Sequence, residues 1–202
     1  MTGPAAHDTV TDGARLHDVD PGTRWRSRTF TACSFVDADL TGLVTEAVVF
    51  DGCDFTGALL TDSSHAGSAF RNCEFRRARL WHATFRGVSL LGSSLSEASL
   101  RPATFEEVDF TLASVSGVDL RDSTLDGCRF RDADLARADL RGASLRGADL
   151  GGARTTGLRL GGADLRGAVV DPGLWIGAET AGATVDAAQA LAYAQAHGLL
   201  VD

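Results

Sequence analysis

Three cysteines are the first side chains in this sequence whose spacing could support chemistry. Cys33, Cys53 and Cys73 recur every twenty residues, so a chain that completes one turn in twenty residues would stack their thiols. Stacked thiols could bind a metal or undergo redox chemistry, but cysteine also packs in cores as a small apolar residue. No Cys-x-x-Cys or His-Glu-x-x-His motif occurs in the sequence. We therefore interpret the thiols as core residues and expect no metal and no cofactor.

His65 is the second candidate for chemistry, and it follows Thr45 by the same twenty residues. A catalytic histidine would need a nucleophile beside it and a pocket for a substrate. The sequence contains neither a Walker loop nor a Gly-x-Ser-x-Gly motif, and the glycines near Gly151 and Gly161 fit turns better than a phosphate cradle. We expect a hydrogen-bonded core histidine and a protein that is not an enzyme.

All these residues belong to a repeat of five. From Trp25 to Val170 the multiples of five form the centres of the repeat, most of them Phe or Leu, and a small residue often precedes each centre by two. Neither the helical period of 3.6 nor the strand period of 2 gives this spacing, which indicates a repeat architecture. The register never slips, and three centres are polar: Thr45, His65 and Thr155.

A second period of twenty lies over the first. Phe30, Phe50 and Phe70 are twenty apart, as are the three cysteines. Like residues that recur every fourth repeat predict a coil with four sides, stacked on the next coil as strands stack in a sheet. About seven to eight coils at the strand spacing give a rod roughly 35 Å long, with the centres inside and the charged residues outside. Such a packed rod leaves no cavity for a substrate.

The repeat divides the chain into three parts. Residues 1–22 are polar, lack the period and are interpreted as a leader or cap with no fixed structure, while residues 23–172 form the solenoid. Residues 173–202 are expected to form a helical module for capping and dimerisation.

A helix is predicted from Ala187 to His197. Asp186 and Gln189 form a capping-box pattern before it, and Gly198 ends it. Ala187, Ala190, Leu191 and Ala194 are expected on one packing face. A helix of about eleven residues is marginal alone, so it must pack on the rod or on a second subunit.

Charge and hydropathy exclude several classes of partner. The net charge is −8, with 19 arginines and no lysine, which argues against binding the phosphate backbone of nucleic acid. No apolar run approaches the length of a membrane span, and the first residues do not form a signal peptide. We expect a cytoplasmic protein that binds neither nucleic acid nor membrane.

The repeat itself resembles a known family. Ala138-Asp139-Leu140-Arg141-Gly142 matches the Ala-(Asp/Asn)-Leu-X-X consensus of the pentapeptide-repeat family. The resemblance implies an all-β fold, a right-handed quadrilateral β-solenoid (pentapeptide repeat) with a short C-terminal α-helix. Words outside the consensus, such as Leu80-Trp81-His82 and Leu100-Arg101-Pro102, are similar to family members that confer fluoroquinolone resistance in mycobacteria.

That similarity implies a function. It implies a homodimer formed through the C-terminal module, and a DNA-mimicking rod that binds DNA gyrase, inhibits its supercoiling and protects it from fluoroquinolone-type poisons. Two alternatives stay open. The chain could provide self-resistance against a natural-product gyrase poison, or it could be a general protein-interaction scaffold.

The charge of the rod as a whole does not imitate DNA. Residues 23–172 hold 20 acids and 18 arginines, whereas DNA of that length would carry about 20 negative charges. The acids gather in two local bands, which a screening length of about 8 Å lets act separately. We expect gyrase to contact these bands, which comprise Asp37, Asp39, Glu46, Asp51, Asp54, Asp62, Glu106, Glu107, Asp109, Asp119, Asp122 and Asp126.

The C-terminal module carries apolar residues that are unusual near a chain end. We expect the dimer interface to comprise Leu174, Trp175, Ile176, Val185, Leu191, Tyr193, Ala194 and Leu199. Capping of the rod by the same residues is compatible with this interface.

Overall fold

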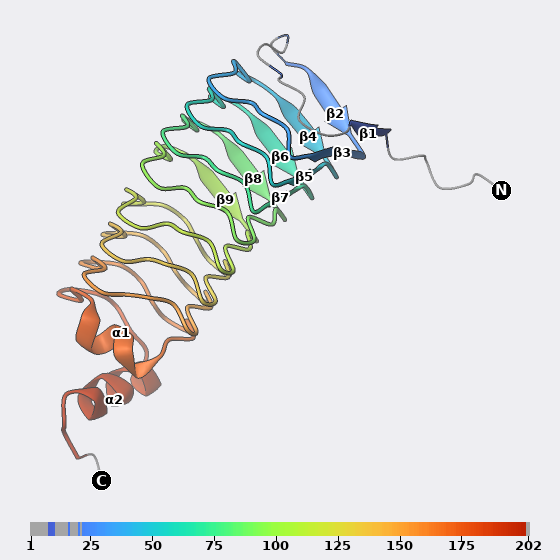
Figure 1. The fold of residues 1–202 in the computed structure, drawn as a ribbon. Helices are drawn as coiled ribbons and strands as arrows, with labels where there is room; N and C mark the ends of the chain where they lie inside the picture. Colours follow the sequence, from blue (N-terminus) through green and yellow to red (C-terminus); the bar gives the residue numbers. More distant parts are fainter. Residues whose placement is uncertain (1–7, 11–15, 17–19, 21, 201–202) are drawn as a thin grey trace.

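The chain winds into a rod with one terminus at each end (Figure 1). The computed structural model describes residues 8–10, 16, 20 and 22–200. Short parallel strands occupy the N-terminal half, and two helices close the C-terminal end (Figure 1). The all-β solenoid with a short C-terminal helix, predicted from the repeat, is confirmed.

Two parallel sheets form two sides of the N-terminal coils, and each pairs residue i with residue i+20. Phe30 pairs with Phe50, and Phe50 with Phe70, which confirms the period of twenty. The first sheet contains β1 (Asp8–Val10), β3 (Arg28–Thr31), β5 (Val49–Asp51) and β7 (Ala69–Arg71). The second contains β2 (Arg24–Arg26), β4 (Val44–Glu46), β6 (Ser64–Ala66), β8 (Thr84–Arg86) and β9 (Thr104–Glu106).

The stack of coils extends beyond residues 23 and 172, the limits predicted for the solenoid. At one end β1 pairs with β3, and at the other end single bridges join Arg159 to Glu179 and Asp164 to Thr184. Pairing of the main chain does not need a bulky centre, so coils can continue where the side-chain pattern has ended. β1 falls in the segment that was predicted to lack fixed structure.

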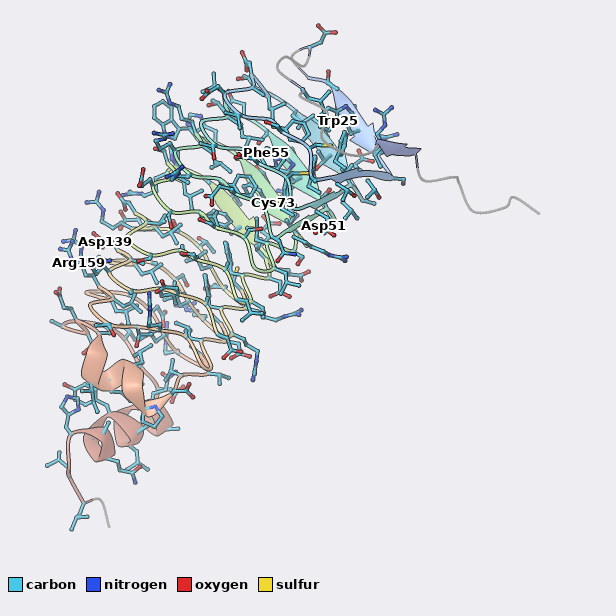
Figure 2. The ribbon with its side chains drawn as sticks, in the orientation of Figure 1. Trp25, Asp51, Phe55, Cys73, Asp139 and Arg159 are labelled. Atoms are coloured by element: carbon cyan, nitrogen blue, oxygen red, sulfur yellow. The ribbon has the colours of Figure 1, made fainter. Side chains whose placement is uncertain are left out.

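The core is a set of columns of like side chains. Phe35, Phe55 and Phe75 lie nearly parallel, with ring centroids 4.6 and 4.9 Å apart. All three are fully buried, and burial of one phenylalanine contributes about 1.5–3 kcal/mol. Figure 2 shows Phe55 and Cys73 on the inside of the coils.

The cysteine ladder lies in this core, as predicted. Cys33, Cys53 and Cys73 are buried, and the Sγ atoms of Cys53 and Cys73 donate to the carbonyls of Phe30 and Phe50, at 3.4 and 3.5 Å. The neighbouring Cys53 thiol and burial raise the pKa of Cys73. A thiol held in this way does not ionise at neutral pH, so it is a poor nucleophile.

His65 is part of a buried chain of hydrogen bonds. Its Nδ1 lies 2.8 Å from Thr45 Oγ1, and its Nε2 lies 3.0 Å from Ser63 Oγ. Ser63 donates its own proton to the carbonyl of Leu60, at 2.7 Å, so it accepts from Nε2. The network therefore assigns a neutral ring that is protonated on Nε2, and the prediction of a hydrogen-bonded core histidine is confirmed.

Two helices cap the last coil, and neither has the length or the apolar run that crossing a bilayer requires. α1 (Pro172–Gly177) begins at the proline that interrupts the repeat, and α2 (Ala187–Ala196) follows Asp186. Asp186 and Gln189 form the predicted capping box, and Gly198, with φ +81°, follows the end of α2.

Most of the predicted face of α2 points away from the rod, which was one of the two packing partners expected for it. Ala187, Ala190 and Leu191 are exposed, whereas Gln189 is buried. The Gln189 amide donates to the carbonyls of Leu165 and Ala168, at 2.6 and 2.8 Å. A polar side chain attaches the helix to the last coil because the final carbonyls of the stack need donors.

Gln189→Ala should loosen this end of the rod. The change leaves two carbonyls without their donor and removes half of the capping box, which costs about 1–3 kcal/mol. Amide hydrogen exchange in residues 187–198 should accelerate roughly tenfold in this variant. Gln195→Ala, an exposed position on the same helix, is the matched control and should exchange as the wild type does. Equal exchange in both variants would contradict the role of Gln189.

His65 should make the rod sensitive to acid. Burial lowers its pKa from 6.5 to about 3, so the stabilisation is fully present above pH 6.5 and is lost as the pH falls through that window. The unfolding free energy should fall by up to about 1.4 kcal/mol per pH unit between pH 6 and pH 4 from this group. Urea denaturation should show a shallower pH dependence for His65→Phe than for the wild type. Identical slopes in the two proteins would contradict this prediction.

Candidate protein-binding surface

The structure divides the twelve predicted gyrase-binding acids into two groups. Most of the second band is neutralised: Glu106 pairs with Arg86 at 2.8 Å, and Asp119 with Arg121 at 2.7 Å. The same holds for Asp109 with Arg129, Asp122 with Arg101, Glu46 with Arg26, and Asp62 with His82 if that ring is protonated. Asp126 accepts from the Ser144 hydroxyl and the Arg146 amide.

The pairing follows from the stack. Residues eighteen to twenty apart lie in adjacent coils, so an arginine in one coil reaches an aspartate in the next, as Arg159 reaches Asp139 at 3.1 Å (Figure 2). The Arg121 guanidinium holds the pKa of Asp119 down at about 2. Counting acids along the sequence identified this band but did not show that its charge is compensated.

Six of the predicted acids have no ion pair within the part of the chain that the structure describes. Four lie in the first band, on two successive corners of the coils. Asp37 occupies one corner and Asp39 follows it, whereas Asp51 and Asp54 flank another corner. The other two, Glu107 and Asp126, are exposed in the second band. Among the predicted acids, the uncompensated negative charge therefore lies mainly in the N-terminal coils.

Local contacts position the first two acids. Asp39 Oδ1 accepts from the Thr41 amide at 3.0 Å, and the hydrogen bonds from Thr41 lower the pKa of Asp39. The Asp37 carboxylate leans over Gly57, where a Cβ would lie 2.1 Å from Oδ1. Gly57 also has φ +71°, so glycine suits both the backbone and the carboxylate above it. The Asp39 carboxylate is therefore held ionised at neutral pH.

The residues of the predicted dimer interface differ in how far they are exposed. Leu174 and Trp175 are buried by their own chain, so they support the cap and provide little surface. Val185 and Ala194 are half-buried. Ile176, Leu191, Tyr193 and Leu199 are exposed, Ile176 by 70%.

A groove of about 460 Å³ lies beside these exposed residues, lined by Trp175, Thr180, Val185, Ala190 and Tyr193 among others. The Trp175 Nε1 atom is buried and has no hydrogen-bond partner among the described residues. The Tyr193 ring stacks on His197 at 4.2 Å and meets Trp175 edge-on at 5.9 Å. The C-terminal end thus combines an apolar surface with a buried donor that lacks an acceptor.

Comparison with known proteins identifies the repeat. The model of the pentapeptide repeat region matches residues 58–129, and the model of pentapeptide repeats in eight copies matches residues 113–152 and 143–170. No sequence among the curated proteins matches the chain.

Solved structures show the same fold over 96–97% of the chain. Full-length QnrB1, a plasmid-mediated fluoroquinolone resistance protein, has a TM-score of 0.76 and 20% identity, covering 96% of this chain and 99% of its own. A trypsin-treated variant of QnrB1 has a TM-score of 0.70 and 22% identity, covering 97% and 98%. Because the repeat, its twenty-residue stack and both family models agree, the chain belongs to the pentapeptide-repeat family.

Proposed function

We propose that this protein is a non-enzymatic DNA mimic that binds DNA gyrase, inhibits supercoiling and protects the enzyme from fluoroquinolone-type poisons. The observation that carries the proposal is the cluster of unpaired acids on the N-terminal coils of a narrow rod. The likeness to QnrB1, which is described as a fluoroquinolone resistance protein, supports the connection to this class of drug.

The mimicry is local. Asp37, Asp39, Asp51 and Asp54 gather unpaired charge on neighbouring corners, over about two coils or 10 Å. Because the screening length is about 8 Å at physiological salt, the paired charges further along the rod contribute little there. A surface that binds DNA carries clustered cations, and such cations would complement these four carboxylates.

The C-terminal module completes the molecule as a homodimer. A second copy would cover Ile176, Leu191, Tyr193 and Leu199, and an acceptor from it could reach the buried Trp175 N–H in the groove. Satisfying a buried donor is worth about 1–3 kcal/mol. Joined at this end, two rods would present their acidic coils at the outer ends of the dimer (Figure 1).

Neutralising the four unpaired acids should weaken inhibition of gyrase. The variant Asp37→Asn, Asp39→Asn, Asp51→Asn, Asp54→Asn is expected to need about tenfold more protein for half-inhibition of supercoiling, since several close charge pairs are lost. The matched control neutralises four ion-paired acids, Asp134, Asp139, Asp149 and Asp164, with the same change in net charge. It should inhibit within about twofold of the wild type, with thermal melts confirming that both variants fold.

The same assay separates the alternatives. Protection of cleaved DNA complexes against a fluoroquinolone supports the proposal, whereas protection only against a natural-product poison favours a self-resistance factor. A wild-type protein without effect on gyrase would reject the proposal in favour of a scaffold for another partner.

The dimer has its own test. Ile176→Glu with Leu199→Glu should convert the dimer to a monomer in sedimentation, because each charge would be buried without a partner. Leu112→Glu, at an equally exposed leucine on the rod, should leave the mass unchanged. A wild-type monomer at micromolar concentration would contradict the interface.

A further inference from the structure

The side chains along one edge of the rod change from negative to positive charge over two coils. Asp37 and Asp39 lie at the negative end of this edge. Asp39 pairs in register with Leu59, and Leu59 with Arg79. Asp37 and Arg77 occupy the equivalent corner two coils apart, with φ of 56° and 59°. At the spacing of stacked strands, about 10 Å separates the two acids from the two arginines, and the uncharged Gly57 and Leu59 occupy the edge between them. We call Asp37, Asp39, Arg77 and Arg79 the dipolar edge.

The four charges of the dipolar edge are uncompensated. None of them forms an ion pair with any residue that the structure describes, whereas every arginine in residues 119–166 except Arg137 does. The neighbouring positions in the columns explain this difference, because Leu59 and Ser99 flank Arg79, and neither is charged. Glu97 follows Arg77 in its column but does not pair with it.

The charges also interact little with one another. Two unit charges about 10 Å apart in water attract by about 0.4 kcal/mol, and physiological salt screens most of that. Both ends of the dipolar edge therefore stay available to a partner.

The arginine end has the composition of a protein-binding surface. Trp81 is 45% exposed on the same side of the coil as Arg79, and Arg76 precedes Arg77 at the corner. A groove of about 220 Å³ lies beside Trp81, lined by Ala98, Ser99, Leu100 and Arg101 among others. Tryptophan and arginine are the residues most enriched where protein interfaces gain their affinity.

We propose that the dipolar edge sets the direction in which the rod lies on gyrase, an inference that rests on the function proposed above. Cationic groups of the enzyme face Asp37 and Asp39, and a carboxylate-bearing patch of the enzyme faces Arg77 and Arg79, with Trp81 beside it. DNA is negative along its whole length, so charge alone gives it no such direction. The arginines thus add to the mimic an orientation that DNA lacks.

A second copy of this chain is the weaker candidate for the same surface. Two antiparallel rods could oppose acids and arginines, but four surface ion pairs contribute only about 0.2–1 kcal/mol each. Association costs on the order of 4–15 kcal/mol, so such a pair of rods would not persist. A larger surface is needed, and the gyrase partner provides one.

Exchanging the charges of the edge tests its polarity. The variant Asp37→Arg, Asp39→Arg, Arg77→Asp, Arg79→Asp keeps the net charge and the composition, and it only reverses the order along the rod. We expect it to need at least tenfold more protein for half-inhibition of supercoiling. The control Asp134→Arg, Arg154→Asp reverses an ion pair on distant coils and should inhibit as the wild type does. Circular dichroism melts verify that both variants fold.

A second variant separates the two ends. Arg77→Gln with Arg79→Gln should weaken inhibition about three- to tenfold if these arginines meet carboxylates. Stronger inhibition by this variant would mean that the arginines face cations, and wild-type inhibition by the exchanged variant would mean that order is irrelevant; either result overturns the inference alone. Binding of wild-type protein to a DNA duplex that is lost in Arg77→Gln, Arg79→Gln would assign the arginines to phosphate and also overturn it. A wild type that does not inhibit gyrase removes the proposed function and this inference together.

Discussion

Hydrogen bonding between each coil and the next is the constraint on which the rest of this molecule depends. The Phe35 amide donates to the Asp54 carbonyl, the Phe55 amide to the Glu74 carbonyl, and the pattern continues along the rod. Because the bonds join residues about twenty apart, every position of the sequence is stacked on its equivalents. Phenylalanine rings, thiols and the Thr45–His65 pair therefore form columns inside, and charged groups form columns outside. A buried main chain without this pairing would lose about 1–3 kcal/mol for each unmet group.

The stacking also explains the surface charge. Equivalent positions lie about 5 Å apart, so like charges in adjacent coils repel and opposite charges attract. Over residues 119–166 the sequence places arginines where they reach aspartates of the neighbouring coil, and the surface there is compensated. Charged side chains in this stack usually pair with an opposite charge nearby, so a charge without an ion pair is unusual. The unpaired charges of Asp37, Asp39, Arg77 and Arg79 therefore indicate a binding surface better than the total number of acids does.

The five-residue period predicts which side chains point into the core. It does not predict which long side chains contact one another on the surface or at the cap. The centres at multiples of five, the inward cysteines and the capping box at Asp186 follow from spacing alone. The compensation of Asp119 could not be predicted from a count, because its partners Arg101 and Arg121 lie eighteen residues before it and two after it. The burial of Leu174 and Trp175 depends on how α1 folds back on the last coil. The face that α2 turns to the rod is set by Gln189, whose amide donates to two carbonyls. The spacing of apolar residues cannot predict such a polar contact.

The candidate site lies on the first coils of the rod, so its geometry depends on the stability of these coils. In a solenoid each coil is stabilised only by its neighbours, so the end coils open most readily. The acids at Asp37 and Asp39 lie close to the N-terminal end, where the neighbours are few. Trp25 lies over this end of the core, 4.8 Å from Phe30 and 6.1 Å from Phe35 between ring centroids, and β1 adds a strand beyond β3. Trp25 and β1 thus protect the coil that carries the binding charges. This arrangement connects the stability of the rod's end to the geometry of the surface that we propose gyrase recognises.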